Sequence, residues 1–552
     1  MPVESLIEEA EEPLSESVPL FEPDEPSPVA KPVRIFNPWA VALVVTIGTF
    51  MEVLDTSIAN VALPHIAGSL SASQDESTWV LTSYLVANAI VLPISGWISS
   101  VIGRKRYYLG CVMLFTLFSA VCGLAPTLGI LVVFRVLQGL AGGGLQPSVQ
   151  AILADTFSIE NRGMAMAVYT VAILCAPVLG PTLGGWITDN YSWRWIFYIN
   201  IPVGVACVLA TRMVLQDPPY MLKQRKERKG KPLSVDLVGL SLVSIGLASV
   251  EVVLDRGQEL DWFGSHFIAT LTILGIGALL FAVFWELRQK NPIVNLRLLG
   301  ERNFLFCCMI VLGLYTVLYA TTFLLPQFMQ EMMGYDATTA GIAMSPSGIA
   351  TIIEVPFVGW MLSRGLDARR MIVIGLVTIM TGSWWMSHMN LQIGEADLIW
   401  PRTLQVLGVG FTTVPLSTIM FRFLPREQSG NAAGIYALVR NEGGSIGIAL
   451  SSTMLQRTAQ LHQTMLVSHL TPADLPAVQA ASAAGQSLGG NVANAHYAGM
   501  ALVYRQLLQQ SSLLAYMDQF RMLSGVILLL IPMVFFLKRP PAAKGKIELD
   551  AH

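Results

Sequence analysis

The chain contains apolar runs of about 20 residues that recur from Trp39 to Leu537, and this pattern constrains its fold more than any other feature. A helix of about 20 residues crosses the roughly 30 Å hydrocarbon core of a bilayer, so each run predicts a membrane span. The 552 residues are 53% hydrophobic and only 13% charged, which a soluble chain of this size does not normally show. The sequence therefore predicts an all-α membrane protein embedded in a lipid bilayer.

We predict fourteen spans, with boundaries good to about 2 to 4 residues. The first seven cover 39–62, 79–100, 107–125, 127–151, 163–187, 195–215 and 234–254. The other seven cover 266–286, 303–325, 338–362, 371–390, 398–421, 431–455 and 520–537.

Basic residues gather in alternate loops between these spans. Cytoplasmic loops of membrane proteins are enriched in Lys and Arg, so the alternation tests the count of spans. The basic loops contain Arg104 to Arg106, Lys223 to Lys231, Arg288 to Arg302 and Arg364 to Arg370, and the tail adds Lys538 to Lys546. The loops near Ser71, Pro126, Gln258 and Asp336 contain few basic residues. Both termini are therefore predicted to be cytoplasmic.

Composition also argues against several other classes of protein. The net charge is −3, and the basic residues follow topology instead of forming a patch with aromatics, so no nucleic-acid partner is predicted. The six cysteines all fall in predicted spans, without the spacing of a disulfide framework or a metal site. Residues 1–37 are acidic and rich in proline, which predicts a disordered cytoplasmic tail and not a signal peptide.

Two motifs recur at similar distances along the chain, which predicts duplicated halves. Gly96-Trp97 is repeated as Gly359-Trp360, 263 residues later, and the RVLQ motif at Arg135 is repeated as RTLQ at Arg402, 267 residues later. Secondary transporters are often built from such repeats. Spans 7 and 8 are then an inserted hairpin. The predicted organisation is a tail at 1–37, a six-helix bundle at 38–215, a linker with the inserted helices at 216–290, a second six-helix bundle at 291–538 and a cytoplasmic tail at 539–552.

Five motifs carry a resemblance to a known family. They are LDTSIANVALP from Leu54, GWISSVIGRKR from Gly96, RVLQGLAGG from Arg135, GPTLGG from Gly180 and WRWIFYINIPVG from Trp193. From Trp39 to Pro540 the chain resembles the fourteen-span drug:proton antiporters of the major facilitator superfamily, the EmrB/QacA type. The resemblance implies the major facilitator fold, with two six-helix bundles plus two inserted helices. It also implies proton-driven efflux of lipophilic toxic compounds across a bacterial inner membrane, with the proton gradient in place of a cofactor.

Asp55 is the first candidate for proton coupling, because it is an acid within an apolar span. A charged group there costs roughly 3 kcal/mol or more, so such residues usually face the bundle interior and carry protons, ions or substrate. Glu52 lies three residues earlier on the same helix face, and two neighbouring carboxyl groups titrate as a pair. The alternative is that Asp55 only caps a broken helix or bonds a neighbouring span.

Arg135 is a second charge within a span and needs a carboxylate or carbonyl partner. The resemblance assigns the matching arginine to proton transfer. The alternative is a permanent structural ion pair. Gln138 shares its helix face at the i+3 position and is a candidate helper or substrate-binding residue.

Two glycine-containing motifs are candidates for gating. In the loop after span 2, the usual Asp and Arg of the family are Ser100 and Val101 here, which leaves Gly96, Gly103, Arg104 and Lys105 to form the cytoplasmic latch. The resemblance identifies the run that contains Gly180, Pro181, Gly184 and Gly185 as the antiporter motif, with a role as hinge and seal. Plain close packing of small residues is the alternative.

The second half supplies three further charges within spans, Glu354, Arg440 and Glu442. They are candidate substrate-binding residues that could set the preferred substrate charge, and the alternative for Glu442 is a local pair with an arginine. Arg440 matches a position that is commonly Arg in the family.

The connection between the last two spans, about 457–518, is too long for an ordinary loop and by parity faces outward. The resemblance implies contact with a periplasmic membrane-fusion adaptor and, through it, with an outer-membrane channel. A plain extracytoplasmic cap is the alternative.

Two rival functions remain on sequence alone. One is a dedicated exporter of a single organic acid, siderophore or metabolite, and the other is a membrane scaffold or sensor without transport. ATP hydrolysis is not indicated, because no Walker-type phosphate loop is present. The sequence places neither a nucleophile with a histidine and an acid, nor a metal-binding cluster, at one depth in the predicted membrane spans. Enzymatic activity is therefore not predicted.

Overall fold

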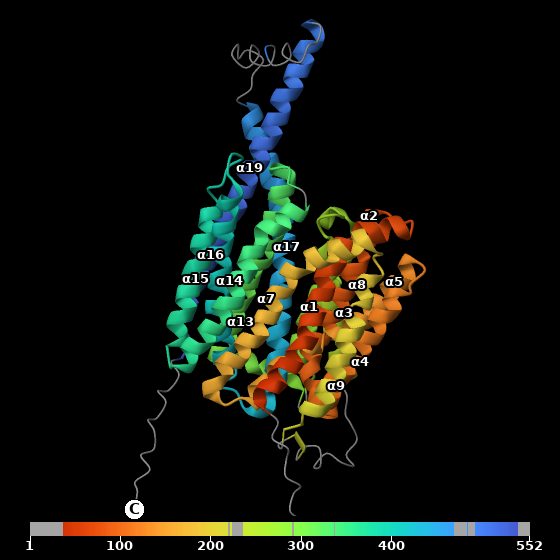
Figure 1. Cartoon of the computed structure of the whole chain (residues 1–552), viewed down its shortest axis with the longest axis vertical. Coiled ribbons are helices and arrows are strands. Elements are labelled where there is room, and N and C mark those ends of the chain that lie inside the picture. The colour runs from red at the N-terminus through yellow and green to blue at the C-terminus, as the bar shows by residue number, and fades with distance from the viewer. Residues whose placement is uncertain are drawn as a thin grey trace, which may run out of the picture. The chain divides into compact units, whose positions relative to one another are not determined.

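Every regular element in the described part of the chain is a helix. The computed structural model of the protein describes residues 37–218, 221–222, 236–289, 292–335, 337–468, 483 and 492–538. The first group of helices, in warm colours in Figure 1, is α1 (Pro38–Ser69), α2 (Gln74–Ser77), α3 (Trp79–Ile102), α4 (Arg104–Gly123), α5 (Leu128–Gly142), α6 (Leu145–Thr156), α7 (Ile159–Asn190), α8 (Trp195–Tyr198) and α9 (Asn200–Val214). We call this group the N-terminal bundle.

The remaining helices form an inserted hairpin and a second bundle. The hairpin is α11 (Leu237–Arg256) and α12 (His266–Arg288). The C-terminal bundle is α13 (Arg302–Met332), α14 (Ala337–Ser363), α15 (Ala368–Met386), α16 (Glu395–Met420), α17 (Ser429–Ser468) and α19 (Val492–Val534). Short 3₁₀ turns occur at Trp262–Gly264, Leu296–Gly300 and Arg426–Gln428.

Each of the fourteen predicted spans falls on one helix or, at 127–151 and 195–215, on two consecutive helices, but not all of them have the composition of a membrane span. Eleven described helices are long and apolar enough to cross a membrane, or twelve if the bent α7 counts as one span. Helices α15 and α17 are not among them. The all-helical fold is thus confirmed, whereas the number of fourteen spans stays a prediction.

Glycine and proline interrupt two of the spans. The helix is interrupted at Gly143 and Gly144, between the end of α5 and the start of α6. A Cβ atom on Gly143 would lie 2.6 Å from the Asn88 carbonyl oxygen of α3, so only glycine permits this close approach. Helix α7 bends by 43° between its parts Asn161–Pro177 and Thr182–Asn190. Proline within a helix removes a backbone hydrogen bond and commonly produces such a bend.

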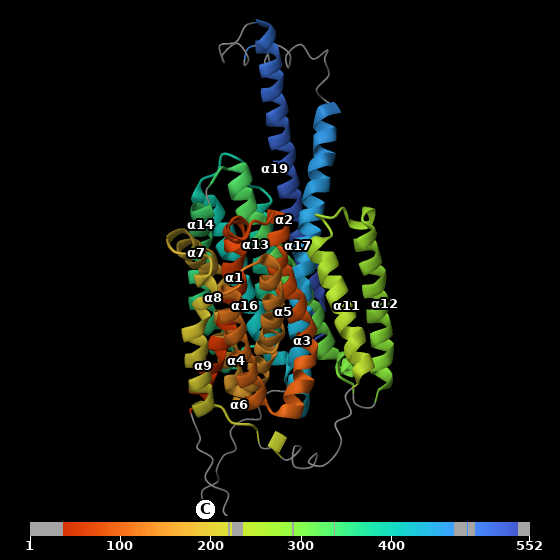
Figure 2. The same ribbon diagram turned by 90° about the vertical axis from the view of Figure 1, so that its right-hand side faces the viewer.

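The hairpin α11–α12 stands beside the two bundles and contacts both. Helix α11 packs on α12 and also on α3 and α17, and Figure 2 shows the hairpin at the edge of the protein. The bundles contact each other mainly through α7 with α14 and α3 with α17. The predicted domain boundaries remain predictions.

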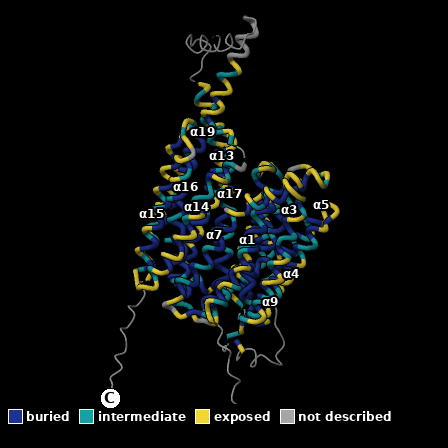
Figure 3. The backbone as a smooth tube through the Cα atoms, viewed as in Figure 1, coloured by how far each residue is buried: buried dark blue, intermediate teal, exposed yellow. Residues whose placement is uncertain are grey.

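Many large apolar side chains are exposed. Figure 3 shows buried stretches in dark blue inside both bundles and exposed stretches in yellow on the outer helices. On α12, Ile273 is 76% exposed and Leu280 is 68% exposed. Apolar surface of this extent is unfavourable in water and favourable against lipid. The outer faces therefore suit a bilayer.

Helices α17 and α19 are longer than the predicted spans and continue together beyond the other helices, as Figure 2 shows. With 40 residues, α17 is about 60 Å long, roughly twice the hydrocarbon thickness. His462 Nε2 lies 2.7 Å from Asp518 Oδ2, and Gln463 Nε2 donates to Tyr504 Oη at 3.2 Å, so the two helices are fastened to each other. We call residues 457–468 and 500–518 the stalk.

Four parts of the predictions lie wholly or partly outside the described residues. They are the tails at 1–36 and 539–552, the basic linker around Lys223 to Lys231 and the middle of the 457–518 segment, residues 469–482 and 484–491.

Candidate functional site

Asp55 is buried in the centre of the N-terminal bundle and pairs with Arg135. The Arg135 Nη1 atom on α5 donates to Asp55 Oδ2 on α1 at 2.6 Å, and the residues are 0% and 2% exposed, respectively. Gln138 Nε2 donates to Asp55 Oδ1 at 3.0 Å and its own Oε1 accepts from Arg135 at 2.9 Å. The structure therefore brings together three residues that the sequence analysis had selected separately.

The same cluster includes residues that the sequence analysis missed. Asn200 Nδ2 on α9 donates to Asp55 Oδ1 at 2.7 Å, and the Val80 carbonyl accepts from Arg135 Nε at 3.0 Å. The guanidinium of Arg135 lies 4.3 Å from the centre of the Tyr84 ring, where a cation–π interaction is favourable. Asn200 lies in the motif WRWIFYINIPVG, and its polar side chain among apolar neighbours was the available signal.

Glu52 lies on α1 with a different set of partners from those of Asp55. Its Oε1 accepts from Asn88 Nδ2 of α3 at 2.9 Å and from Gln146 Nε2 of α6 at 3.1 Å. Its Oε2 is buried and has no hydrogen-bond partner among the described residues. The sequence selected Glu52 but neither of its amide partners. Whether Glu52 and Asp55 titrate as a pair stays a prediction.

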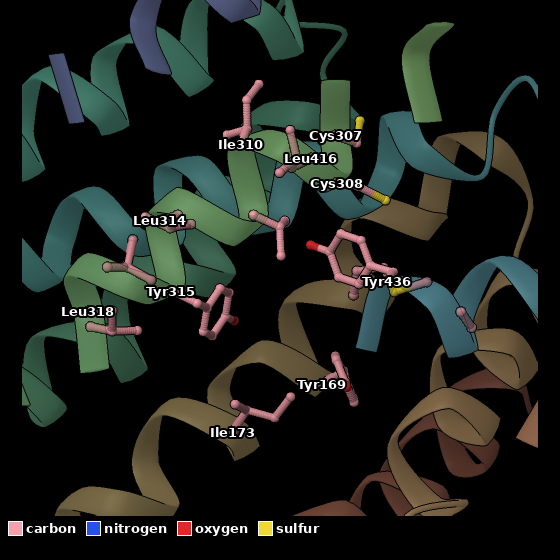
Figure 4. Close-up of a cluster of buried hydrophobic side chains, with 14 of the residues drawn as sticks. Tyr169, Ile173, Cys307, Cys308, Ile310, Leu314, Tyr315, Leu318, Leu416 and Tyr436 are labelled. Carbon is pink, nitrogen blue, oxygen red and sulfur yellow. The ribbon is translucent and has the colours of Figure 1, made fainter. Parts of the chain in front are cut away.

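Arg440 reaches from α17 of the C-terminal bundle towards the N-terminal bundle. Its Nη1 donates to Tyr169 Oη of α7 at 3.1 Å, and its guanidinium lies 5.6 Å from the centre of the Tyr315 ring of α13. Figure 4 shows Tyr169, Tyr315 and Tyr436, from three different helices, around the same part of the interior. Gln150 of α6 donates to the same Tyr169 Oη at 3.1 Å, one helical turn after Gln146, the partner of Glu52. A basic and an acidic group from opposite bundles therefore share the central region with several aromatic rings.

The other two candidate substrate residues lie elsewhere. The carboxyl group of Glu354 on α14 contacts Gly410 of α16, inside the C-terminal bundle. Neither of its oxygens has a hydrogen-bond partner among the described residues, and Glu354 is 6% exposed. Glu442 lies on α17 one helical turn before Ser445, which binds Glu251 of the inserted hairpin, and no ion pair with an arginine is present for Glu442 in the described residues. Only Arg440 of the three joins the central group.

The repeated RTLQ motif places Arg402 in the C-terminal bundle much as Arg135 lies in the other. Arg402 Nη1 donates to Gln405 Oε1 at 2.6 Å and to Thr321 Oγ1 at 2.9 Å, and Nη2 donates to Thr322 Oγ1 at 2.7 Å. Threonines of α13 thus take the place that Asp55 holds in α1. Of the two repeats, only the N-terminal one combines the buried arginine with an acid.

The two bundles meet at Arg104, at the end that the sequence analysis predicts to be cytoplasmic. Its guanidinium forms an ion pair with Asp155 of α6, donates to the Ala151 carbonyl at 2.6 Å, and donates to Ser429 Oγ of α17 at 2.7 Å. A Cβ atom on Gly96 would lie 2.5 Å from the backbone nitrogen of Asn431, so α3 and α17 approach to backbone contact. The bundles are therefore closed at the end where Arg104 lies, which the sequence analysis predicts to be cytoplasmic. Asp155 and Ser429 were not found from the sequence.

Gly103 and Lys105 form the turn that begins α4. Gly103 has a φ of +99°, a backbone conformation that favours glycine, and a Cβ atom there would lie 2.9 Å from Asp217 Oδ2. Asp217 Oδ1 accepts from the Lys105 backbone nitrogen at 2.8 Å, and the Lys105 ammonium donates to the Arg212 carbonyl at 2.8 Å. These two residues therefore fix the start of α4, whereas Arg104 makes the contact between bundles.

The GPTLGG run lies where α7 packs on α1. A Cβ atom on Gly180 would overlap the Ser57 side chain, and one on Gly184 would lie 3.2 Å from the Ile58 carbonyl oxygen. A Cβ atom on Gly185 would meet nothing within 4 Å. Pro181 lies at the bend of α7. Two of the three glycines are thus required for close packing, and their role as hinge or seal remains a prediction.

Comparison with known proteins assigns the family. The Major Facilitator Superfamily profile matches residues 45–448. The chain is 36% identical over 506 residues to the multidrug export protein EmrB of Escherichia coli K12, covering 91% of this chain and 96% of that protein. It is 34% identical to the fatty acid resistance protein FarB of Neisseria gonorrhoeae, covering 92% and 97%. Among solved structures, the proton:xylose symporter XylE has a TM-score of 0.59 at 12% identity, covering 91% of this chain and 96% of that chain, which supports the fold. The chain therefore belongs to the major facilitator superfamily, within its group of EmrB-type transporters.

Proposed function

We propose that this protein exports lipophilic toxic small molecules from the cytoplasm or inner leaflet in exchange for protons, as a multi-pass protein of a bacterial inner membrane with both termini cytoplasmic. The observation that carries the proposal is the ion pair of Asp55 with Arg135, 2.6 Å long and buried within apolar helices. A carboxylate of this kind is the expected proton carrier of a secondary transporter. The family of the chain and the name of its relative EmrB support drug efflux.

The geometry suggests how protonation is coupled to conformation. In the observed state the charge of Asp55 is balanced by Arg135 and by hydrogen bonds from Gln138 and Asn200. A proton on Asp55 removes the counter-charge of Arg135, and an unbalanced buried guanidinium is strongly unfavourable. The protonated protein therefore favours a rearranged or hydrated N-terminal bundle. This difference between the two states lets proton binding and release drive alternating access.

The substrate is proposed to bind in the central region between Glu52 and Arg440. Tyrosine rings around Arg440 offer apolar and cation–π contacts to lipophilic compounds of varied shape. A dedicated exporter of one organic acid is the second candidate, because Arg440 has tyrosine but no carboxylate as a contact among the described residues. A lipophilic anion would pair with this guanidinium.

Transport by the purified protein tests the proposed function. We expect an imposed pH gradient across proteoliposomes to drive movement of several unrelated compounds from a panel of lipophilic cations, such as ethidium, and lipophilic weak acids. Fluorescence or radiolabel uptake measures the movement, and liposomes treated with a protonophore are the control. Movement of a single acid would favour the dedicated exporter. No gradient-dependent movement of any compound would contradict proton-driven export.

We further propose that the stalk binds a periplasmic adaptor that leads to an outer-membrane channel. The stalk exposes large apolar side chains, Leu461, Met465 and Val467 on α17 and Met500 and Tyr504 on α19, each between 47% and 53% exposed. Exposed apolar side chains on helices that extend beyond the bilayer are suited to packing against a helix of a partner protein.

Deletion within the stalk is expected to separate transport from resistance. Removing part of 457–518, which lies outside the described transport site, should leave gradient-driven transport in proteoliposomes close to that of the intact protein. The same deletion should abolish the resistance that the protein gives to cells with an outer membrane. Minimum inhibitory concentrations and vesicle transport are measured on the same variant, with membrane levels as the control. Equal loss in both assays would argue against adaptor binding.

A further inference from the structure

A second buried carboxyl group lies at the junction between the inserted hairpin and the two bundles. Glu251 on α11 is 1% exposed, and its Oε1 accepts from Ser445 Oγ of α17 at 2.8 Å. Its Oε2 is buried and has no hydrogen-bond partner among the described residues. An unpaired polar atom in the interior is costly, so a carboxyl group placed there needs a counter-ion or a proton.

A second acid lies one helical turn from the serine that binds Glu251. Glu442 is on α17, three residues before Ser445, so the two residues share the face of α17 that the hairpin contacts. Glu442 Oε1 is also buried without a hydrogen-bond partner in the described part of the chain. Arg440, two residues away, is directed to Tyr169 and Tyr315 instead. Two buried carboxyl groups therefore lie near Ser445, and neither has an ion pair among the described residues.

In the described part of the chain, the helices around Glu251 supply no ion pair for it. On α11 itself, Asp255 is a third acid and bonds Thr82 of α3, while Arg256 pairs with Glu259 at 2.9 Å and bonds Thr78. On α12, residues 267–285 contain no charged side chain. A proton is the species that this acidic pair can bind without further ligands, because two adjacent carboxyl groups can share one.

The hairpin is attached to both bundles near these acids. It bonds α3 through Asp255 and Arg256, and it bonds α17 through Ser445. Further out, Trp262 Nε1 donates to Thr453 Oγ1 of α17 at 3.1 Å. Figure 2 shows α11 beside both α3 and α17. A movement of one bundle against the other must therefore change the distance between Glu251 and its neighbours.

We propose that Glu251 and Glu442 form a second protonation site of the transporter. The two carboxyl groups hold one shared proton while α11 and α17 are in contact, and that proton passes to water when the helices separate and each carboxylate is hydrated. This inference rests on the proposed function, because it assumes that the bundles move. It gives the inserted hairpin a part in energy coupling and not only in packing.

Infrared spectroscopy of the purified full-length protein in liposomes tests the site without any substrate. Protonated carboxyl groups have a C=O stretching band that is lost on ionisation, so a pH titration shows each buried acid. The variants are Glu251→Gln, Glu442→Gln, Asp55→Asn and, as a matched control, Glu286→Gln. Glu286 lies on the same hairpin, is 1% exposed, and has no hydrogen-bond partner for either oxygen in the described residues.

We expect one titrating band to be absent from both Glu251→Gln and Glu442→Gln and to be retained in Asp55→Asn and Glu286→Gln. Two independent bands, each removed by only one of the two variants, would overturn the proposal, as would unchanged spectra. If either glutamine variant fails to fold, Ser445→Ala removes only the hydrogen bond to Glu251 and must shift the midpoint of this band. An unchanged midpoint would also refute the site. Because no transported compound is needed, failure of the proposed function would not be confused with failure of this site.

Discussion

Replacing Asp55 with asparagine abolishes proton-driven export while the protein still reaches the membrane in folded form. Asparagine retains an oxygen that accepts hydrogen bonds from Gln138 and Asn200, but it cannot carry a proton. The gradient-driven rate should fall at least about tenfold, since the step that couples transport to the gradient is lost. Ethidium or weak-acid transport into proteoliposomes with an imposed pH gradient measures this change. Proton-linked efflux that survives at the wild-type rate would exclude Asp55 as the proton carrier.

A double variant separates the loss of coupling from a loss of stability. Asp55→Asn leaves the Arg135 guanidinium, which is 0% exposed, without its counter-ion, and breaking a buried pair in this way typically costs about 3–5 kcal/mol. Adding Arg135→Gln removes the unpaired charge. Thermal unfolding should show partial recovery of stability in the double variant, whereas gradient-driven transport should remain absent. Recovery of transport together with stability would mean that the pair is only structural.

Replacing Gly96 with valine prevents closure of the cytoplasmic side and stops transport. A Cβ atom at this position would lie 2.5 Å from backbone atoms of Gly430 and Asn431, which cannot rotate away as a side chain can. Forcing extra atoms into a packed contact costs about 1–3 kcal/mol, which shifts a two-state equilibrium about 5- to 150-fold. The population should therefore move from the closed state towards one that is open to the cytoplasm. Gly110→Val is the matched control, because a Cβ atom on Gly110 of α4 meets nothing within 4 Å.

Labelling of a buried cysteine reports this shift directly. Ala154 lies near the cytoplasmic end of α6 and is 3% exposed, so Ala154→Cys in a background without the native cysteines should react slowly with a water-soluble maleimide. Gly96→Val should increase the labelling rate in inside-out vesicles, and Gly110→Val should not. Equal rates in the three proteins would show that the close approach at Gly96 does not control closure.

The sequence predicted the helices well and located charges within them, because both leave local signals. Apolar runs of about 20 residues identified every long helix, and an acid or arginine within such a run drew attention to Asp55, Arg135, Arg440 and Glu354. The repeated RVLQ and RTLQ motifs predicted duplicated halves, and the structure places Arg135 against α1 and Arg402 against α13.

The partners of those charges could not be predicted, since contacts between distant segments depend on helix rotation and tilt. Asn200 reaches Asp55 across 145 residues, and Ser429 reaches Arg104 across 325 residues. The pairing of Glu442 with an arginine was an open alternative. The structure shows no such ion pair among the described residues and places Glu442 one helical turn from Ser445, the partner of Glu251, which the sequence analysis had not selected. The predicted spans 431–455 and 520–537 were also shorter than the helices α17 and α19 that contain them. Polar helical residues outside the bilayer carry no hydropathy signal, so the predicted spans stopped near Leu455 and began again near Phe520.

Helix α17 is one continuous rod that joins the latch at Ser429, the centre at Arg440, the hairpin contact at Ser445 and the stalk that ends at Ser468. A rod about 60 Å long acts as a lever: a tilt of about 10° at its cytoplasmic end displaces its far end by about 10 Å. The opening and closing of the inner gate is therefore transmitted, with amplification, to a point well outside the bilayer. A partner bound to the end of α17 would therefore be displaced each time the transporter changes its orientation.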